Sequence, residues 1–306
     1  IHKKQVILDN DPIPDVFYLF CKEKPANLTG KIIVNMEDIK MEEIEKLYPD
    51  LEIGGHWMPK DCEANHRVAI IVPYRNREPH LKIFLRHMHG LLRKQEIDYG
   101  IFVVEQIENQ TFNRAKLMNV GFVEALKVYD WQCFIFHDVD LLPEDDRNLY
   151  TCPEQPRHMS VAIDKFKYKL TYPGLFGGVT ALTKEQLETI NGFPNVYWGW
   201  GAEDDDIARR LRLNNLTISR YPENIAKYKM IKHQPEPKNV CKDVLYNKME
   251  QRYQRDGLSN LNYTVLKIEK NYLFTKIIVD LLENESKKEL FKEGIFMNCT
   301  KLKIKY

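Results

Sequence analysis

The chain has 306 residues, with 45 Lys and Arg against 44 Asp and Glu, so its formal net charge is only +1. A balance this even leaves no basic footprint for nucleic acid and excludes that class of partner. No apolar run approaches the roughly 20 residues that cross a bilayer, and no signal peptide is visible. Because the sequence starts at Ile1, we expect a mature or trimmed part of a longer protein, with a membrane anchor outside it.

Cysteines and glycosylation sequons favour a secretory protein. The six cysteines include no Cys-x-x-Cys pair, which argues against a structural zinc site. An even cysteine count combined with dense Asn-x-Ser/Thr sequons is typical of a luminal or extracellular protein with disulfides. The sequons, which we expect to carry N-glycans, are at Asn27, Asn109, Asn215, Asn262, Asn284 and Asn298.

The chain divides at about residue 66. Residues 1–66 contain several prolines and only short apolar runs, and they predict an N-terminal arm with one short helix over 41–48. We expect a Cys21–Cys62 disulfide to pin this arm. Residues 67–306 are predicted to form one α/β domain, long enough to bury a large core.

Strands and helices alternate at the start of that domain. Continuous apolar runs at residues 68–72, 99–104 and 134–136 predict strands buried on both faces. One helix is expected to begin near Pro79, and a second to carry an inward-facing stripe that ends at Val128. This rhythm predicts an α/β fold with a largely parallel sheet. Neither GxGxxG nor a Walker-A motif occurs, so the two usual phosphate-binding loops are absent from the sequence.

Two carboxylates follow the third predicted strand. Asp138 and Asp140 are spaced i, i+2, so on a regular strand they would share a face, at the sheet edge where open α/β sheets bind ligands. They repel each other unless a cation or donor groups separate them, and a divalent metal that carries a diphosphate fits this need. A lone Asp-x-Asp is also typical of a solvated acidic turn.

Two arginines end the first predicted strand at the same edge. The guanidinium groups of Arg75 and Arg77 suit a diphosphate, and Tyr74 and Phe112 are available to flank a planar base. The other interpretation is that both arginines are ordinary surface charges.

The second half combines glycines, aromatic rings and acids. Residues 175–182 are predicted to form a strand, whose Gly177-Gly178 pair indicates close approach of a ligand or another backbone. Thr183 and Gln186 predict a capping box at a helix start. Residues 198–206 then read Trp-Gly-Trp-Gly-Ala-Glu-Asp-Asp-Asp.

Residues 198–206 are typical of a sugar site, where rings stack on sugar faces and acids bind hydroxyls. One such acid can take a proton from an acceptor hydroxyl, and the glycines allow a loop to close over the site. The alternative is that the four carboxylates only stabilise the first turn of a helix. His233, with Met230 three residues before it, is a candidate metal ligand, although a lone histidine more often has a structural role.

Several of these motifs, taken in order, resemble the animal β-1,4-galactosyltransferases and their N-acetylgalactosaminyl relatives, which form glycosyltransferase family 7. Within that family the sequence is most similar to the invertebrate members that transfer N-acetylgalactosamine. The resemblance covers about residues 21–280, and the matching pieces lie at 72–77, 112–116, 137–140, 176–179, 191–194, 198–206 and 256–258.

The resemblance implies a GT-A glycosyltransferase fold: one catalytic domain over residues 67–306, with a largely parallel, twisted central sheet flanked by helices. It also implies a luminal Golgi enzyme with a type II membrane anchor. The implied reaction is inverting, Mn²⁺-dependent transfer from a UDP-sugar to the 4-hydroxyl of a terminal N-acetylglucosamine.

The same resemblance implies roles for individual residues. Asp204 would be the general base and Glu203 would bind the donor sugar. The metal ligands would be Asp140, Met230 and His233, although a thioether is an odd partner for Mn²⁺. The nucleotide site would comprise Pro73, Tyr74, Arg75, Arg77, Phe112, Asp138, Val139, Lys165, Gly178 and Trp200. Further sugar contacts would come from Phe166, Tyr172, Leu175, Trp200 and Asp205.

The resemblance also implies two disulfides, Cys21–Cys62 and Cys133–Cys152. A Cys241–Cys299 disulfide does not match the family pattern and is our own inference from the remaining cysteines.

One position separates the two possible donors. Galactosyl members of the family carry Tyr immediately before Phe-Gly-Gly, whereas this chain has Leu175. A tyrosine hydroxyl there would crowd the acetamido group of UDP-GalNAc, so we predict UDP-GalNAc as the donor and a LacdiNAc product. The alternatives are a galactosyltransferase that uses UDP-galactose, a non-catalytic carbohydrate-binding module, and a Leu175 that simply packs in the core.

Overall fold

The computed structural model describes residues 19–292. The helices are α1 Met41–Leu47, α2 Glu78–Lys94, α3 Arg114–Leu126, α4 Lys184–Thr189, α5 Glu203–Leu213, α6 Lys242–Asn247, α7 Met249–Arg252 and α8 Glu283–Lys292. The strands are β1 His56–Trp57, β2 Arg67–Tyr74, β3 Asp98–Gln106, β4 Cys133–His137, β5 Leu141–Pro143, β6 Arg157–His158, β7 Ala162–Ile163, β8 Val179–Thr183, β9 Lys227–Met230, β10 Thr264–Lys270 and β11 Thr275–Asp280.

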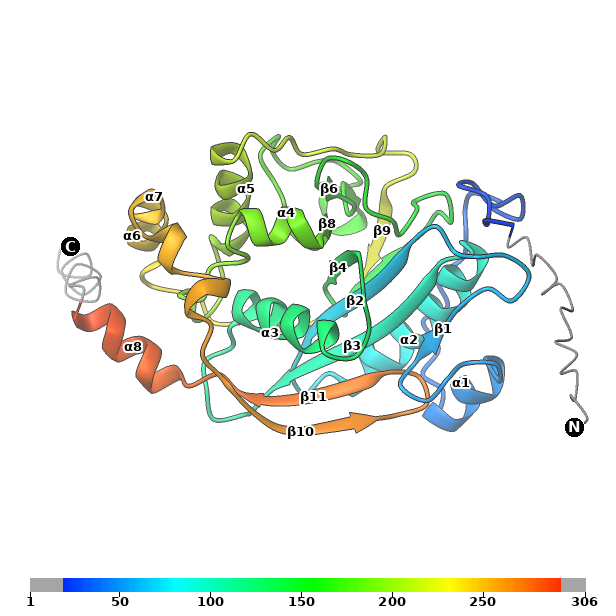
Figure 1. Cartoon of the computed structure of the whole chain (residues 1–306), viewed down its shortest axis with the longest axis horizontal. Coiled ribbons are helices and arrows are strands. Elements are labelled where there is room, and N and C mark those ends of the chain that lie inside the picture. Colours follow the sequence, from blue (N-terminus) through cyan, green and yellow to red (C-terminus); the bar gives the residue numbers. More distant parts are fainter. Residues whose placement is uncertain (1–18, 293–306) are drawn as a thin grey trace, which may run out of the picture.

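A central mixed sheet has the strand order β10-β11-β3-β2-β4-β8-β6, and β1 also pairs with β3 (Figure 1). The pairs β11–β3, β3–β2 and β2–β4 are parallel, which confirms a largely parallel centre. Both flanks of this centre are antiparallel, through β10–β11 on one side and β4–β8–β6 on the other. The carboxyl ends of β2, β3 and β4 therefore meet at one edge of the sheet.

Alternate residues of the central strands face two different hydrophobic cores. In β2, Val68, Ile70 and Val72 pack with α2, whereas Ala69 and Ile71 pack with α3, so the two helices cover opposite faces (Figure 1). This double burial explains why the strands are continuous apolar runs. The prediction that Val128 faces inward was wrong. Helix α3 ends at Leu126, and Val128 is half exposed.

Segments from both ends of the chain complete the sheet. The predicted short helix of the arm is confirmed as α1, and β1 from the same arm pairs antiparallel with β3. From the other end of the chain come β10 and β11, and β11 lies inside the central sheet beside β3.

Two predicted disulfides, Cys21–Cys62 and Cys133–Cys152, are present. Cys299 and Asn298 lie outside the described residues, and so does the predicted Cys241–Cys299 pairing.

Two local predictions need correction. Strand β8 begins at Val179 rather than at residue 175, because Gly178 has a φ of +71° and so cannot continue an extended strand. Asp138 and Asp140 do not share a strand face, because β4 ends at His137 and both aspartates lie in the turn before β5. The capping box is confirmed, with Thr183 and Gln186 bonded to each other's backbone at the start of α4.

A small second sheet, with the order β5-β9-β7, lies next to the turn that carries the two aspartates. Leu141 of β5 pairs with Met230 of β9, and the backbone N–H of Ile231 donates to the carbonyl of Asp140 at 2.8 Å. This pairing brings residues 138–140 next to residues 230–233, about 90 positions later in the chain.

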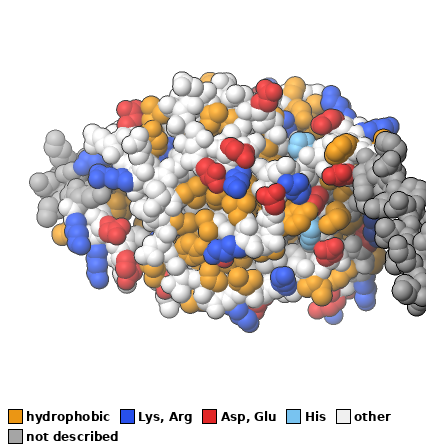
Figure 2. Space-filling model, in the orientation of Figure 1, with side chains coloured by type: hydrophobic (Ala, Val, Ile, Leu, Met, Phe, Trp, Pro, Cys, Tyr) orange, Lys and Arg blue, Asp and Glu red, His pale blue; other side chains and the backbone are white. Residues whose placement is uncertain are grey.

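The surface carries both signs of charge. On the face in Figure 2, basic and acidic side chains are interspersed among apolar ones, in keeping with the net charge of +1. Within residues 19–292, every helix is too short or too polar to cross a membrane.

Candidate active site

A cavity of about 630 Å³ opens at the carboxyl edge of the central sheet. Its walls come from the ends of β2, β4 and β9, from α5, and from the loops around them. It is lined by Pro73, Arg75, Arg77, Phe112, Arg114, Asp138, Val139, Asp140, Lys165, Gly178, Gly199, Trp200, Glu203, Asp204, Met230, His233, Pro235, Glu236, Pro237 and Lys238. Most of the predicted site residues are thus brought together in one place.

Three predicted metal ligands face this cavity. Oδ2 of Asp140 lies 2.9 Å from Nε2 of His233, and Met230 comes from the adjoining end of β9. That carboxylate oxygen is buried, yet it has no well-oriented hydrogen bond from any described residue. The close contact with the Asp140 carboxylate raises the pKa of His233, and the same contact lowers the pKa of Asp140 despite its burial. One carboxylate, one imidazole and one thioether together fit a first-row transition metal ion.

Asp138 points to a different partner. Nε of Arg114 donates to its Oδ1 at 2.6 Å, and Arg114 also lies 3.7 Å from Oε1 of Glu203. Burial alone would lower the pKa of Arg114, but these two carboxylates outweigh it and raise that pKa. Arg114 is therefore a fixed positive charge between the Asp-x-Asp turn and helix α5.

The first turn of α5 presents two acids to the cavity, the buried Glu203 and the half-buried Asp204. Burial, with the charge of Asp204, raises the pKa of Glu203 to about 7, and Oε2 of Glu203 has no hydrogen-bond partner among the described residues. Burial, with the charge of Asp205, also raises the pKa of Asp204. A carboxylate with a raised pKa is a stronger base than one in water, which suits it to accept a proton.

Gly177 leaves room for Asp204. A Cβ placed on Gly177 would lie 2.6 Å from Oδ2 of Asp204, closer than real Cβ contacts come. The first glycine of the Phe-Gly-Gly motif therefore lets the backbone of that loop approach the carboxylate of α5.

The Trp-Gly-Trp-Gly segment forms a turn against a later segment of the chain. Trp198 is buried, while Trp200 is 54% exposed and lines the cavity. The Trp200 N–H donates to the Pro237 carbonyl at 2.8 Å, and the Asn239 N–H donates to the Trp200 carbonyl at 3.0 Å. Residues 235–239 thus hold residues 198–201, which we call the tryptophan loop, at the wall of the cavity.

The arginines after β2 are placed for an anion. Arg75 stacks over the ring of Phe112, with 5.0 Å between the guanidinium carbon and the ring centre. Its Nη2 donates to the carboxylate of Glu236 at 3.3 Å. Arg77 lies at the start of α2 and also lines the cavity.

Five predicted residues do not line the cavity: Tyr74, Phe166, Tyr172, Leu175 and Asp205. Tyr74 is buried, and its hydroxyl accepts from the backbone N–H of Arg77. Tyr172 donates to Oδ1 of Asp205 at 2.8 Å, so these two form a pair next to Asp204. Phe166 is 41% exposed and adjoins Lys165, which does line the cavity.

Sequence reasoning missed three charged residues that line the cavity: Arg114, Glu236 and Lys238. Arg114 lies one position after the Asn113 N-cap, at the sheet edge where ligands were expected, so its position was a usable signal. Glu236 had no such signal, because its contact with Arg75 joins residues 161 positions apart.

Family comparisons agree with this geometry. A family described as "N-terminal region of glycosyl transferase group 7" matches residues 21–153, and one described as "N-terminal domain of galactosyltransferase" matches residues 157–234. Mouse β-1,4-galactosyltransferase 1 is 45% identical over 282 residues, which cover 90% of this chain and 71% of the relative. Chinese hamster (Cricetulus griseus) β-1,4-galactosyltransferase 3 is 47% identical over 267 residues, or 86% of this chain and 68% of the relative.

Solved structures show the same similarity. The catalytic domain of Drosophila β-1,4-galactosyltransferase 7 in complex with xylobiose has a TM-score of 0.62 and 32% identity, and it covers 72% of this chain and 98% of its own. A point mutant of that protein, in complex with manganese, UDP-Gal and xylobiose, has a TM-score of 0.62 and 31% identity. It also covers 72% of this chain and 98% of its own.

The fold and the cavity define a GT-A glycosyltransferase, an enzyme that transfers a sugar from a nucleotide-sugar donor. The chain belongs to glycosyltransferase family 7, the β-1,4-galactosyltransferase family.

Proposed function

We propose that this enzyme transfers a hexose from a UDP-sugar, with inversion and with Mn²⁺, to the 4-hydroxyl of a terminal N-acetylglucosamine. The observation that carries the proposal is one cavity that joins the Asp140–His233 pair, the arginines after β2 and the acids of α5. Its relatives are named β-1,4-galactosyltransferases, and a solved relative is a complex with manganese and UDP-Gal.

In this proposal Asp140, Met230 and His233 hold the Mn²⁺. When bound, the ion supplies Lewis acidity to the leaving diphosphate. Arg75 and Arg77 bind the diphosphate by charge, and Phe112 provides a flat face for the uracil ring. Because Glu236 contacts Arg75 in the structure described here, a diphosphate has to displace that carboxylate to reach the guanidinium group.

The acids of α5 serve the transferred sugar and the acceptor. Asp204, with its raised pKa, takes the proton from the acceptor hydroxyl as that oxygen attacks the anomeric carbon of the donor. Glu203 binds the donor sugar, and its unpaired Oε2 is available for a sugar hydroxyl. One displacement inverts the anomeric centre, with no covalent intermediate.

Exposed aromatic side chains near the cavity suit an acceptor sugar. Phe166, Tyr172 and Trp200 are 41%, 39% and 54% exposed, although large apolar side chains are usually buried. Rings of this kind stack on the apolar faces of sugars. We propose that they hold the acceptor, together with Asp205, which Tyr172 orients.

Two donors are candidates. The names of the relatives favour UDP-galactose, and we take it as the first candidate. UDP-GalNAc remains the second candidate because Leu175 replaces the tyrosine that galactosyl members carry. Leu175 is held by its backbone, which accepts from Arg220 at 2.8 Å and donates to the Tyr172 carbonyl at 3.2 Å.

A donor panel tests both candidates. Initial rates with UDP-galactose and UDP-GalNAc are compared on one acceptor that ends in N-acetylglucosamine, with Mn²⁺ and with excess chelator. Faster transfer of galactose supports the first candidate, and faster transfer of GalNAc supports the second. If Leu175 sets the choice, Leu175→Tyr shifts the ratio of kcat/KM towards galactose. If the enzyme transfers sugar from neither UDP-galactose nor UDP-GalNAc, the proposed function is refuted.

We further propose a Golgi location, with the catalytic domain at residues 67–306 in the lumen and residues 1–66 as an arm next to a type II anchor. Exposure of the described sequons, at Asn27, Asn109, Asn215, Asn262 and Asn284, supports N-glycosylation there. A mobility shift after glycosidase treatment of protein from a secretory host tests this.

A further inference from the structure

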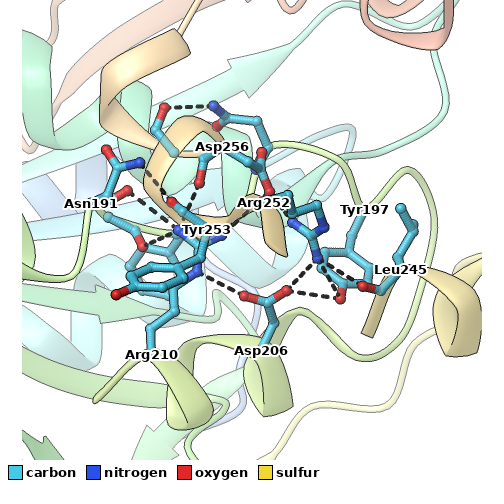
Figure 3. Close-up of polar contacts among 12 residues, drawn as sticks. Asn191, Tyr197, Asp206, Arg210, Leu245, Arg252, Tyr253 and Asp256 are labelled. Carbon is cyan, nitrogen blue, oxygen red and sulfur yellow. Dashed lines mark hydrogen bonds and ion pairs between the residues drawn. The ribbon is translucent and has the colours of Figure 1, made fainter. Parts of the chain in front are cut away.

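A closed ring of ion pairs lies in the core behind helix α5 (Figure 3). Its members are Asp206 and Arg210 of α5, Arg252 of α7 and Asp256, and each is less than 5% exposed. The ring contains two positive and two negative side chains, so its formal charges cancel. Four charged groups this deeply buried are unusual unless they are paired.

The four contacts of the ring follow one another. Nε of Arg210 contacts Oδ1 of Asp206 at 2.7 Å, and Nη2 of Arg210 contacts Oδ2 of Asp256 at 3.3 Å. Nη1 of Arg252 contacts the same Asp256 oxygen, and Nη2 of Arg252 contacts Oδ2 of Asp206 at 2.5 Å. Each carboxylate therefore bridges both guanidinium groups.

Arg252 extends the ring to two further segments. Its Nη2 donates to the hydroxyl of Tyr197 at 3.1 Å and to the carbonyl of Leu245 at 3.1 Å. The Tyr197 hydroxyl in turn donates to Oδ2 of Asp206 at 2.9 Å. One guanidinium group thus joins α5, the residue before the tryptophan loop, and helix α6.

These segments are the ones that surround the reacting end of the cavity. Tyr197 immediately precedes residues 198–201, whose Trp200 lines the cavity. Asp206 lies two positions after Asp204 on the same helix, so one side chain faces the buried ring and the other faces the cavity. Leu245 follows the segment 235–239, which bonds to Trp200.

The helix dipole does not account for Asp206. Acids in a first turn stabilise a helix while exposed to water, whereas Asp206 is fully buried and receives bonds from Arg210, Arg252 and Tyr197. Burying ion pairs gives little net stability compared with apolar packing, and in some proteins buried charged groups instead fix one arrangement of the chain. A geometric role therefore fits this ring better than a purely stabilising one.

We propose that Arg252 is a positioning residue for the transfer reaction: it fixes the tryptophan loop and the first turn of α5 relative to each other, and so sets Trp200 and Asp204 against the substrates. Arg252 does not line the cavity and touches no substrate in this arrangement. The proposal rests on the roles given to Asp204 and Trp200 in the proposed function.

The test compares Arg252→Lys with Arg255→Lys. Lysine keeps the charge at position 252 but cannot reach Asp206, Tyr197 and Asp256 together, because it lacks the guanidinium fork. Arg255 is exposed and three positions away, which makes it a matched control. Tyr197→Phe removes only one hydroxyl and serves as a second variant if Arg252→Lys does not fold.

Three readouts are measured: kcat and KM for donor and acceptor, UDP affinity with Mn²⁺ by calorimetry, and hydrogen exchange in the apo protein. For Arg252→Lys we expect kcat to fall about tenfold or more, since small misplacements of reacting groups are costly. UDP affinity should stay within about twofold, because the diphosphate groups are untouched. Exchange should rise in residues 197–206 and not in α3, and Arg255→Lys should match the wild type. Tyr197→Phe should show the same pattern, more weakly.

Unchanged exchange and unchanged kcat in both Arg252→Lys and Tyr197→Phe would overturn the proposal. It would equally be overturned if kcat and UDP affinity fell together while exchange rose throughout the chain, because that pattern marks general destabilisation. A wild type that transfers no sugar would refute the proposed function instead, and the exchange data would still show whether Arg252 orders residues 197–206.

Discussion

Gly177→Ala is expected to slow catalysis without disturbing the fold. The glycine lies in the loop before β8, where the carboxylate of Asp204 packs directly against its backbone. The backbone at Gly177 is not in the left-handed region, so alanine can adopt the same conformation. The substitution therefore adds one methyl group next to the proposed base and leaves the rest of the chain unchanged.

The size of the effect follows from the distances. The added Cβ would lie 2.6 Å from Oδ2 of Asp204, and ordinary contact begins at 3.4 Å, so the carboxylate has to move by about 0.8 Å. A misplacement of about 1 Å can cost about 100-fold in rate. We expect kcat to fall between about tenfold and about 100-fold, which corresponds to about 1.4 to 2.7 kcal/mol in the barrier.

The assay is the initial rate of sugar transfer at saturating donor and acceptor, together with UDP affinity by calorimetry and thermal unfolding. The matched control is Gly174→Ala in the same loop, because a Cβ there meets its nearest neighbour, Nη1 of Arg212, at an ordinary 3.7 Å. UDP affinity and unfolding temperature should be close to wild type in both variants. A Gly177→Ala enzyme with kcat within twofold of the Gly174→Ala control would refute the reasoning.

Three other predictions follow from single sites. Asp204→Asn should lower kcat by about 10²–10⁴-fold with UDP affinity retained, whereas a non-catalytic sugar-binding module would have no turnover to lose. His89 is held neutral, with Nε2 against the Leu273 carbonyl and Nδ1 against the Tyr99 hydroxyl, and burial lowers its pKa to about 4. Because the unfolded pKa is about 6.5, its contribution to stability is present above that pH and is lost as the pH falls towards 4. Urea unfolding should show about 2 kcal/mol of this loss between pH 7.5 and pH 5, and a His89→Gln variant with an equally steep pH dependence would contradict the assignment. Replacing Cys133 and Cys152 together by Ala should lower the free energy of unfolding by about 3 kcal/mol, because that disulfide closes a loop with a sequence separation of 19. If this variant and the oxidised wild type unfold at the same urea midpoint, the predicted stabilisation by the disulfide is wrong.

The parts of the fold with a strong local pattern were predictable from the sequence. Strands β2, β3 and β4 are continuous apolar runs because both of their faces are buried. The start of α4 was predictable because a capping box is a local chemical signal. The order of strands in the sheet was not predictable in the same way, since β11 reaches its place beside β3 only through tertiary pairing.

Errors arose where a short pattern had two interpretations. The apolar Leu175 and Phe176 before β8 suggested a longer strand, but the positive φ at Gly178 starts the strand later. Asp138 and Asp140 were assigned to one strand face by their spacing, whereas the end of β4 at His137 frees them to bind separate partners.

The order of the motifs identified most of the residues that line the cavity, but it did not predict which of their side chains contact one another. The three-residue pairing of β5 with β9 joins Asp140 to His233, and strands this short carry almost no sequence signal. The Arg114 contacts and the buried ring around Arg252 depend on side chains from distant segments. Such contacts are properties of the folded chain and have no counterpart in local spacing.

The pairing partners of β3 have a consequence for how the protein is made. On the side of β3 away from β2, β1 covers Tyr99 and Gly100, whereas β11 covers the stretch from Phe102 to Gln106. A ribosome has to release the chain through β11, which ends at Asp280, before these β3 residues are paired, so until then a nascent chain carries unpaired backbone amides on an apolar strand. Such a delay favours slow maturation and dependence on chaperones, and a truncation before residue 275 is expected to aggregate rather than to fold.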